Sequence, residues 1–416
     1  NSPAGGTVSA AYQINTGPAT ATPVTGWGAG SWGSGTWGVG TTNYDPLRLW
    51  SQTNFGEDLI FSPRGGSLYY WDATNTVNTR GIAVETMYGA SEVPTLVDYV
   101  LVSDVSRFVF CFGCNDYGAT TLDPMLIRWS EQEDPYTWTP AATNQAGDYR
   151  LSRGSEIVAA QQTRQEILVF TDAAVYSMQY LGPPYVWGFN ILSNNISVIG
   201  PNAIGAANNI VYWMGTDKFY VYTGRVETLP CALRQYVYGD INLEQNYQVF
   251  CGSNEGYSEI WWFYCSANST TVDRYVIFNY LDKVWYYGTL NRSAWLDSPL
   301  RNYPMGATYQ HTMVYHEKGN DDIEVNGTTL PIESYIQSSD FDIGDGHNYG
   351  FVWRMIPDIT FDGSTTPSPL TPSVTMTMRP RRNPGSGYGT ADSPTVASAQ
   401  SYAGQSTYTV QEFTEI

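Results

Sequence analysis

The feature that most limits how this chain can fold is a β-hairpin pattern that recurs along it. Each copy has a run of apolar and aromatic residues, a turn rich in glycine or polar residues, and a second apolar run. The copies occupy residues 58–72, 107–130, 166–180, 209–224 and 259–288, and a less regular one occupies residues 312–319. They recur about 40 to 55 residues apart, a spacing that fits one four-stranded propeller blade per copy.

The pattern predicts an all-β fold, with a β-propeller of about five to seven blades over residues 45–362. A β-sandwich also contains short strands, but it does not so readily give similar hairpins in series. Residues 1–44 are predicted to form an extended Gly/Trp-rich arm or part of a neighbouring β domain. Residues 363–416 are predicted to form a Pro/Ser/Thr-rich C-terminal segment with one β-strand at 373–380.

The N-terminal arm carries a near-repeat in which Trp27, Trp32 and Trp37 stand between glycines. A tryptophan at every fifth position suits neither a helix nor the core of an ordinary strand. Because large aromatic side chains contribute much of the binding energy of interfaces, the three indoles are candidate interface anchors. A platform on which a glycan stacks is the rival interpretation.

The charge balance narrows the choice of partners. The chain has 20 Lys and Arg against 39 Asp and Glu, a formal net charge of -19. Proteins that grip nucleic acid or an anionic membrane need cationic side chains, so such binding is disfavoured. An acidic wall past which DNA slides without sticking is compatible with this charge.

No apolar run is long enough to span a bilayer, which predicts no membrane anchor, and we see no signal-peptide pattern. The sequence does not begin with Met, so targeting information could lie outside it.

Few residues suggest catalysis or metal binding. His311 and His316 flank a strand-like run and are expected on its opposite faces, which disfavours a shared metal; the third histidine is His347. Five cysteines are too few and too odd in number for a disulfide framework. The C-x-x-C sequence of Cys111 and Cys114 occurs once. A zinc site would need a second pair of ligands at a suitable spacing, and a redox motif would need a helix directly after it. We therefore expect buried apolar thiols there.

Acidic residues leave one enzymatic alternative open. Residues 340–348 superficially resemble a calcium loop, but Phe351 stands where a bidentate Glu would be required. A carboxylate pair for glycoside hydrolysis stays open, because the separation of two side chains in space is not visible in a sequence. The sequence otherwise predicts no catalytic, cofactor-binding or metal-binding residue, and no cofactor.

Several segments resemble the tail-nozzle, or packaged-DNA stabilisation, proteins of podovirus-type phages, which include the tail tubular protein B-like proteins. The most specific motifs are W-x-x-x-N-F-G-E-D-L-I, beginning at Trp50, and W-M-G-x-x-x-F-Y-V-Y-x-G, beginning at Trp213. The segments that carry the resemblance are residues 12–38, 48–72, 180–204, 211–242 and 338–359.

The resemblance implies a structural subunit of a short phage tail and no enzymatic activity. Such a subunit would assemble as a homo-hexamer in the distal tail of the virion, below the portal and adaptor and in contact with adaptor and other tail proteins. Double-stranded DNA would pass through its lumen without sequence-specific binding, and the host surface is a further candidate partner. Two alternatives stay open: a carbohydrate-binding or receptor-reading propeller, with or without glycan cleavage, and an extracellular adhesion module unconnected with phage.

Overall fold

The computed structural model describes residues 17–21, 47–319, 321–323, 329–332, 336, 338–342, 344, 374–379 and 406–410. The chain divides into two compact units, Asn1–Leu330 and Pro331–Ile416. Nearly all regular structure in the described residues is β-strand. Among these residues, no helix is long and apolar enough to cross a membrane. The domain boundaries expected at residues 44 and 362 remain predictions, because the chain around both lies outside the described ranges.

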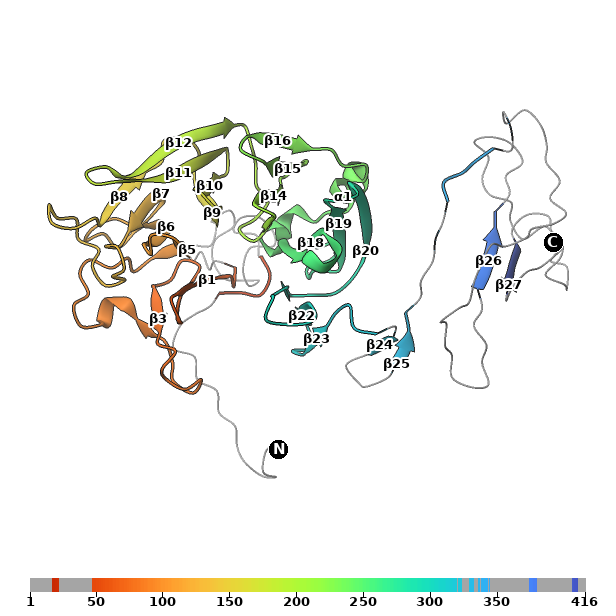
Figure 1. Cartoon of the computed structure of the whole chain (residues 1–416), viewed down its shortest axis with the longest axis horizontal. Coiled ribbons are helices and arrows are strands. Elements are labelled where there is room, and N and C mark those ends of the chain that lie inside the picture. The colour runs from red at the N-terminus through yellow and green to blue at the C-terminus, as the bar shows by residue number, and fades with distance from the viewer. Residues whose placement is uncertain are drawn as a thin grey trace, which may run out of the picture. The chain divides into compact units, whose positions relative to one another are not determined.

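Six antiparallel sheets follow one another along the first unit as the blades of a β-propeller (Figure 1). Five blades have four strands, and the sixth has three in the described residues. Within each blade the order of the strands in the sheet is their order in the chain. The predicted all-β propeller is therefore confirmed, and the number of blades falls within the predicted range.

The strands of the six blades have the following bounds. They are β1 (Trp50–Phe55), β2 (Asp58–Pro63), β3 (Tyr69–Trp71) and β4 (Ile82–Ala83) in blade 1; β5 (Val97–Val102), β6 (Val109–Asn115), β7 (Leu122–Trp129) and β8 (Gly147–Arg150) in blade 2; β9 (Ile157–Gln162), β10 (Ile167–Thr171), β11 (Ala174–Gly182) and β12 (Val186–Asn194) in blade 3; β13 (Ile204–Ala207), β14 (Ile210–Met214), β15 (Phe219–Tyr222) and β16 (Val226–Leu229) in blade 4; β17 (Phe250–Asn254), β18 (Glu259–Tyr264), β19 (Arg274–Asn279) and β20 (Val284–Thr289) in blade 5; and β21 (Ala294–Leu296), β22 (Met305–Ala307) and β23 (Met313–Tyr315) in blade 6.

The remaining elements are short. The helices are η1 (Val84–Thr86), α1 (Arg234–Asp240), η2 (Leu243–Gln248) and η3 (Glu255–Tyr257), and the other strands are β24 (Asp321–Ile323), β25 (Thr329–Pro331), β26 (Val374–Met378) and β27 (Ser406–Val410). In the second unit β26 pairs with β27 in antiparallel register, and β26 is the strand predicted at 373–380.

At four junctions between blades the first strands lie next to one another, around the propeller axis. Contacts join β1 to β5, β5 to β9, β13 to β17 and β17 to β21. Small residues permit this close approach: a Cβ atom on Gly205 of β13 would clash with the thiol of Cys251 in β17. A Cβ atom on Gly252 of β17 would likewise clash with Trp295 in β21.

In blades 2 to 5 the second and third strands supply most of the core, because both faces of these strands pack against neighbouring blades. Every residue of β6 and of β10 is buried. Aromatic pairs join consecutive blades, and their ring centroids lie within the range of favourable aromatic contacts. The pairs are Phe110–Trp187 at 4.9 Å, Phe170–Trp213 at 5.1 Å, Phe219–Trp262 at 4.9 Å and Trp261–Trp295 at 5.1 Å.

A short N-terminal segment, residues 17–21, is bound to the propeller at two places. The side-chain amide of Gln245 in η2 accepts a hydrogen bond from Ala21 N at 2.9 Å and donates one to Ala21 O at 3.0 Å. Arg48, just before β1, donates its backbone N–H to Pro18 O at 2.6 Å. Gln245 is 3% exposed, so this amide is a buried clamp on main-chain atoms. The segment links the start of blade 1 to the connection between blades 4 and 5.

Candidate functional site at the mouth of the central channel

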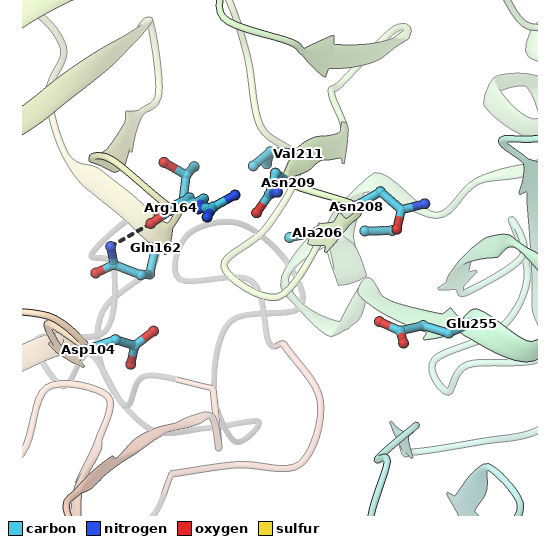
Figure 2. A pocket seen from close by; sticks show the side chains of 10 residues that line it. Asp104, Gln162, Arg164, Ala206, Asn208, Asn209, Val211 and Glu255 are labelled. Atoms are coloured by element: carbon cyan, nitrogen blue, oxygen red, sulfur yellow. Dashed lines mark hydrogen bonds between the residues drawn. The ribbon is translucent and has the colours of Figure 1, made fainter.

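A cavity of about 440 Å³ lies where the turns between the first and second strands of four blades meet. Asp104 follows β5, Arg164 lies between β9 and β10, Asn209 between β13 and β14, and Glu255 begins η3 after β17 (Figure 2). These positions belong to blades 2, 3, 4 and 5. Since the first strands of these blades lie around the propeller axis, the cavity lies near that axis at this end, and we call it the channel mouth.

Local turn chemistry holds these side chains in place. Asn208 and Asn209 both have positive φ, 52° and 62°, which is the backbone of the two-residue turn that Asn favours in β-hairpins. Thr163 closes the β9–β10 turn, because its Oγ1 donates to Glu166 O at 2.7 Å. Gln162 donates its amide to Thr163 O at 2.6 Å, and its buried Oε1 has no hydrogen-bond partner among the described residues.

The lining is polar and of mixed charge. It contains the carboxylates of Asp104 and Glu255, the guanidinium of Arg164 and the amides of Gln162 and Asn209, together with small apolar groups. In Figure 2 the side chains of Arg164 and Asn209 point toward one another. Such a lining can hydrogen-bond a neutral polyol or a zwitterion, whereas a bare phosphate would meet two carboxylates.

A second group of charged residues lies at the other end of the strands. The guanidinium of Arg64, which follows β2, lies 4.0 Å from Asp98 of β5 and 3.8 Å from Glu156, which precedes β9. The same guanidinium lies over the ring of Tyr247 in η2, at 4.9 Å from the centroid. The hydroxyl of Tyr247 donates to Glu156 at 2.8 Å. We call these four residues the axial cluster; they join blades 1, 2 and 3 to the connection that leads into blade 5.

Burial sets the electrostatics of the axial cluster. Desolvation raises the pKa of Asp98 above its usual value, Arg64 opposes that shift, and the charge of Glu156 adds to it. The Nη1 atom of Arg64 is buried without a hydrogen-bond partner among the described residues. A cavity of about 10 Å³ adjoins it, room for one water molecule. The cluster therefore has the character of a structural ion pair rather than of a ligand site.

Another pair of carboxylates bears on the glycosidase alternative. Asn254 Nδ2 contacts Glu259 at 3.3 Å and Glu317 at 3.4 Å, and Trp261 Nε1 donates to Glu259 at 2.9 Å. Burial raises the pKa of Glu259, and the charge of Glu317 adds to the rise. Neither carboxylate lines the cavity at the channel mouth, so the two features do not combine into one site.

The candidate anchors Trp27, Trp32 and Trp37 lie outside the described residues, so their role as interface anchors remains a prediction. His347 and most of the calcium-like segment also lie outside them. Within the described ranges, no group of three potential metal-ligating side chains is found.

The two cysteines of the C-x-x-C sequence are buried in the core, as expected. A β-bulge at Gly113, whose φ is 59°, separates Cys111 from Cys114 and turns both into the same apolar cluster. The thiol of Cys114 donates to the carbonyls of Cys111 and Leu126, at 3.6 and 3.7 Å. Burial raises the pKa of both thiols, which keeps them protonated and unreactive near neutral pH.

The histidines flank β23 in different settings. His311 lies in the turn that precedes the strand, with φ of 63°. His316 follows the strand, where its Nε2 accepts a hydrogen bond from Arg292 Nε at 2.9 Å and its ring packs on Trp295 at 4.6 Å. Burial and the charge of Arg292 lower the pKa of His316 to about 4. His316 is therefore a neutral hydrogen-bond acceptor.

Comparisons with known proteins find likeness only among solved structures. No protein-family model and no curated protein matches the chain. Hsv2 of Kluyveromyces marxianus matches at 11% identity with a TM-score of 0.37, over 68% of this chain and 76% of that one. Hsv2 of Kluyveromyces lactis matches at 14% and 0.38, over 70% and 82%, and the CNH domain of AfRom2 matches at 8% and 0.36, over 64% and 82%. The order of strands and the arrangement of blades, rather than these likenesses, define the propeller here.

Proposed function

We propose that this chain is a structural, non-catalytic subunit of a short bacteriophage tail, where it forms a hexameric nozzle that retains packaged DNA and guides its ejection. The single observation that carries the proposal is the sequence resemblance, through its two most specific motifs. The motif beginning at Trp50 forms the β1–β2 hairpin, and the motif beginning at Trp213 runs from the end of β14 through β15. Both motifs therefore fall on hairpins of the propeller, each covering residues of two paired strands and the turn between them.

The packing of the propeller suits a part that must bear pressure. Trp213 and Trp262 are fully buried, and each contacts a phenylalanine of a neighbouring blade. Large aromatic side chains bury much area and have few rotatable bonds, so junctions of this kind resist deformation. The axial cluster adds a polar tie between blades that are not consecutive.

A test on purified particles addresses the proposal directly. Six-fold averaged cryo-electron microscopy of the virion, combined with mass spectrometry of its peptides, should locate six copies around the DNA channel at the distal tail. Absence of the peptides from the virion, or a position on a peripheral fibre, would reject the nozzle assignment.

The cavity at the channel mouth favours a second candidate function, a propeller that binds a host glycan. Its mixed polar lining, with Arg164, Asn209 and Glu255, matches the hydrogen-bonding needs of a sugar. A glycan array with the full chain tests this function. Binding that disappears in Arg164→Ala and persists in Arg153→Ala, a variant of an arginine outside the cavity lining, would support it. The absence of any bound glycan would leave the structural role alone.

A further inference from the structure

Two stretches of the sequence without a charged residue, which we call sectors, reach the outer rim of the propeller, one on blade 3 and one on blade 5. Between Asp172 and Asp217 the sequence has no Asp, Glu, Lys or Arg, and this stretch includes β11 and β12. Between Lys283 and Arg292 it again has none, and this stretch includes β20. Both β12 and β20 are the outermost strands of their sheets (Figure 1).

Large apolar side chains are exposed in both sectors. We define the β12 rim as Tyr180, Leu181, Tyr185 and Ile191, which are 41% to 78% exposed. We define the β20 rim as Tyr236, Val284, Tyr286 and Tyr287, which are 40% to 52% exposed. Tyr236 of α1 belongs to the second surface because its ring lies 4.4 Å from that of Tyr287.

The outer strands of other blades lack this combination. Strand β4 has only two residues, β8 contains Asp148 and Arg150, and β16 contains Glu227. Strand β23, the outer strand of blade 6 in the described residues, contains no charge but has only three residues. Short strands and charges are the usual protection of a sheet edge against pairing with another chain. Strands β12 and β20 contain neither a charge nor a proline, and they have nine and six residues. These two edges are therefore the ones suited to contact with another molecule.

The charge of the chain favours a second copy as that molecule. Two copies with a net charge of -19 repel each other over most of their surfaces. They can approach more closely where a surface has few charges, and strands β11, β12 and β20, which carry most residues of the two rims, contain none. The two rims are therefore the surfaces at which repulsion between two copies of this acidic chain is weakest.

The positions of the two rims indicate the geometry of the assembly. Blade 4 alone separates blade 3 from blade 5, so two steps of about 60° place the rims about 120° apart in a ring of six blades. Two different surfaces on one subunit give a closed head-to-tail ring, and about 120° is the angle between the neighbours of a subunit in a six-membered ring. We propose that the β12 rim of one copy packs on the β20 rim of the next; this inference rests on the proposed ring-forming function.

Matched substitutions test the contact in the full chain. Tyr185→Glu places a charge on the β12 rim, Tyr286→Glu places one on the β20 rim, and Tyr88→Glu is the control, because Tyr88 is fully exposed outside both rims. Native mass spectrometry should detect oligomers of up to six copies for the wild type and the control, and monomers for each rim variant. Circular dichroism and thermal unfolding check that the variants are folded.

Mixing the two rim variants gives the decisive result. A head-to-tail contact leaves one intact junction, between the β12 rim of Tyr286→Glu and the β20 rim of Tyr185→Glu, so the mixture should form two-chain complexes that neither variant forms alone. A mixture that stays monomeric, a wild type that stays monomeric at its highest soluble concentration, or rim variants that assemble like the control would each overturn the proposal.

The inference and the nozzle assignment can fail separately. A six-fold ring in the virion whose neighbours meet through other surfaces would reject the rim contact and leave the nozzle standing. A chain that is absent from the virion but still gives two-chain complexes in the mixing experiment would reject the nozzle and keep the rim contact.

Discussion

The axis and the rim of the propeller differ in where charged side chains occur. At the axis, Arg64 lies within 4.0 Å of two carboxylates, and these groups come from different blades. On the rim, β12 and β20 carry no charge at all. The difference indicates that charged groups near the axis hold the blades of one copy together, whereas the rim leaves apolar area available to a neighbour.

The same comparison refines the expectation of an acidic wall for DNA. The channel mouth is lined by Arg164 as well as by Asp104 and Glu255, so its lining is mixed rather than uniformly acidic. Any acidic lumen in a ring of six copies would have to be formed by other surfaces of the subunit. Replacing lumen-facing Asp or Glu by Lys and measuring the rate of DNA ejection remains the test of that idea.

The largest effect is expected from removing the cation of the axial cluster. Arg64→Ala should lower the free energy of unfolding by about 3 kcal/mol, because it leaves the buried carboxylate of Asp98 without its counter-ion. The double variant Arg64→Met, Asp98→Asn should lose less, since no uncompensated charge stays buried. Urea unfolding followed by tryptophan fluorescence measures both, and a loss below about 1 kcal/mol for the single variant would contradict the structural role of the cluster.

The next effect concerns the clamp on the N-terminal segment. Gln245→Leu removes both hydrogen bonds to Ala21 and should cost about 1 to 3 kcal/mol, because buried polar groups lose their partners. Hydrogen exchange at the Ala21 amide should become faster. Gln165→Leu, in the exposed β9–β10 turn, is the matched control and should change neither quantity. Unchanged exchange at Ala21 in the Gln245 variant would rule out the clamp.

A smaller effect should depend on pH. The folded pKa of His316, about 4, lies below the ordinary value of 6.5, so the unfolded chain binds a proton that the folded chain does not. Stability from this group is therefore full above about pH 6.5 and is lost as the pH falls toward 4. His316→Gln keeps an acceptor for Arg292 and should flatten this part of the stability profile. A profile of the same slope in the variant would show that other groups cause it.

The smallest effect on stability is expected on the rim. Tyr185→Glu should change the free energy of unfolding of the monomer by no more than about 0.5 kcal/mol, as is usual for exposed positions. Measurement at a dilution where the wild type is monomeric separates this quantity from association. The two variants together test the comparison of axis and rim. The Arg64→Ala substitution at the axis should change only the stability of the fold, and the Tyr185→Glu substitution on the rim should change only assembly. A Tyr185→Glu monomer that is much less stable than the wild-type monomer would contradict this separation of folding from assembly.

The strands that could be predicted from the sequence are those buried on both faces. Strands β6 and β10 are apolar up to their last residues, Asn115 and Thr171, and so the middle hairpins of the blades were visible as a repeat. The first strands give a weaker signal because crowding at the axis selects small residues, such as Ala159 and Ala160 in β9. The number of blades could thus be bounded but not fixed.

The candidate sites were harder to predict for a different reason. In the sequence, Arg64 belongs to a polar turn before two glycines. The residues around it do not indicate that Asp98 and Glu156 approach it from other blades. The cavity at the channel mouth likewise combines side chains from four turns that are far apart in the chain. The C-x-x-C thiols could be assigned to the core because the strand around them is continuously apolar.

The attachment of residues 17–21 also has a mechanical consequence. Gln245 and Arg48 hold main-chain atoms, so a pulling force on the N-terminal side of this segment is transmitted to the body of the propeller and not to any one side chain of the segment. The force divides between the start of blade 1 and the η2 connection before blade 5. Tension on the arm is therefore spread over two distant anchorage points, and strand β1 does not have to peel from its blade before the tension is shared.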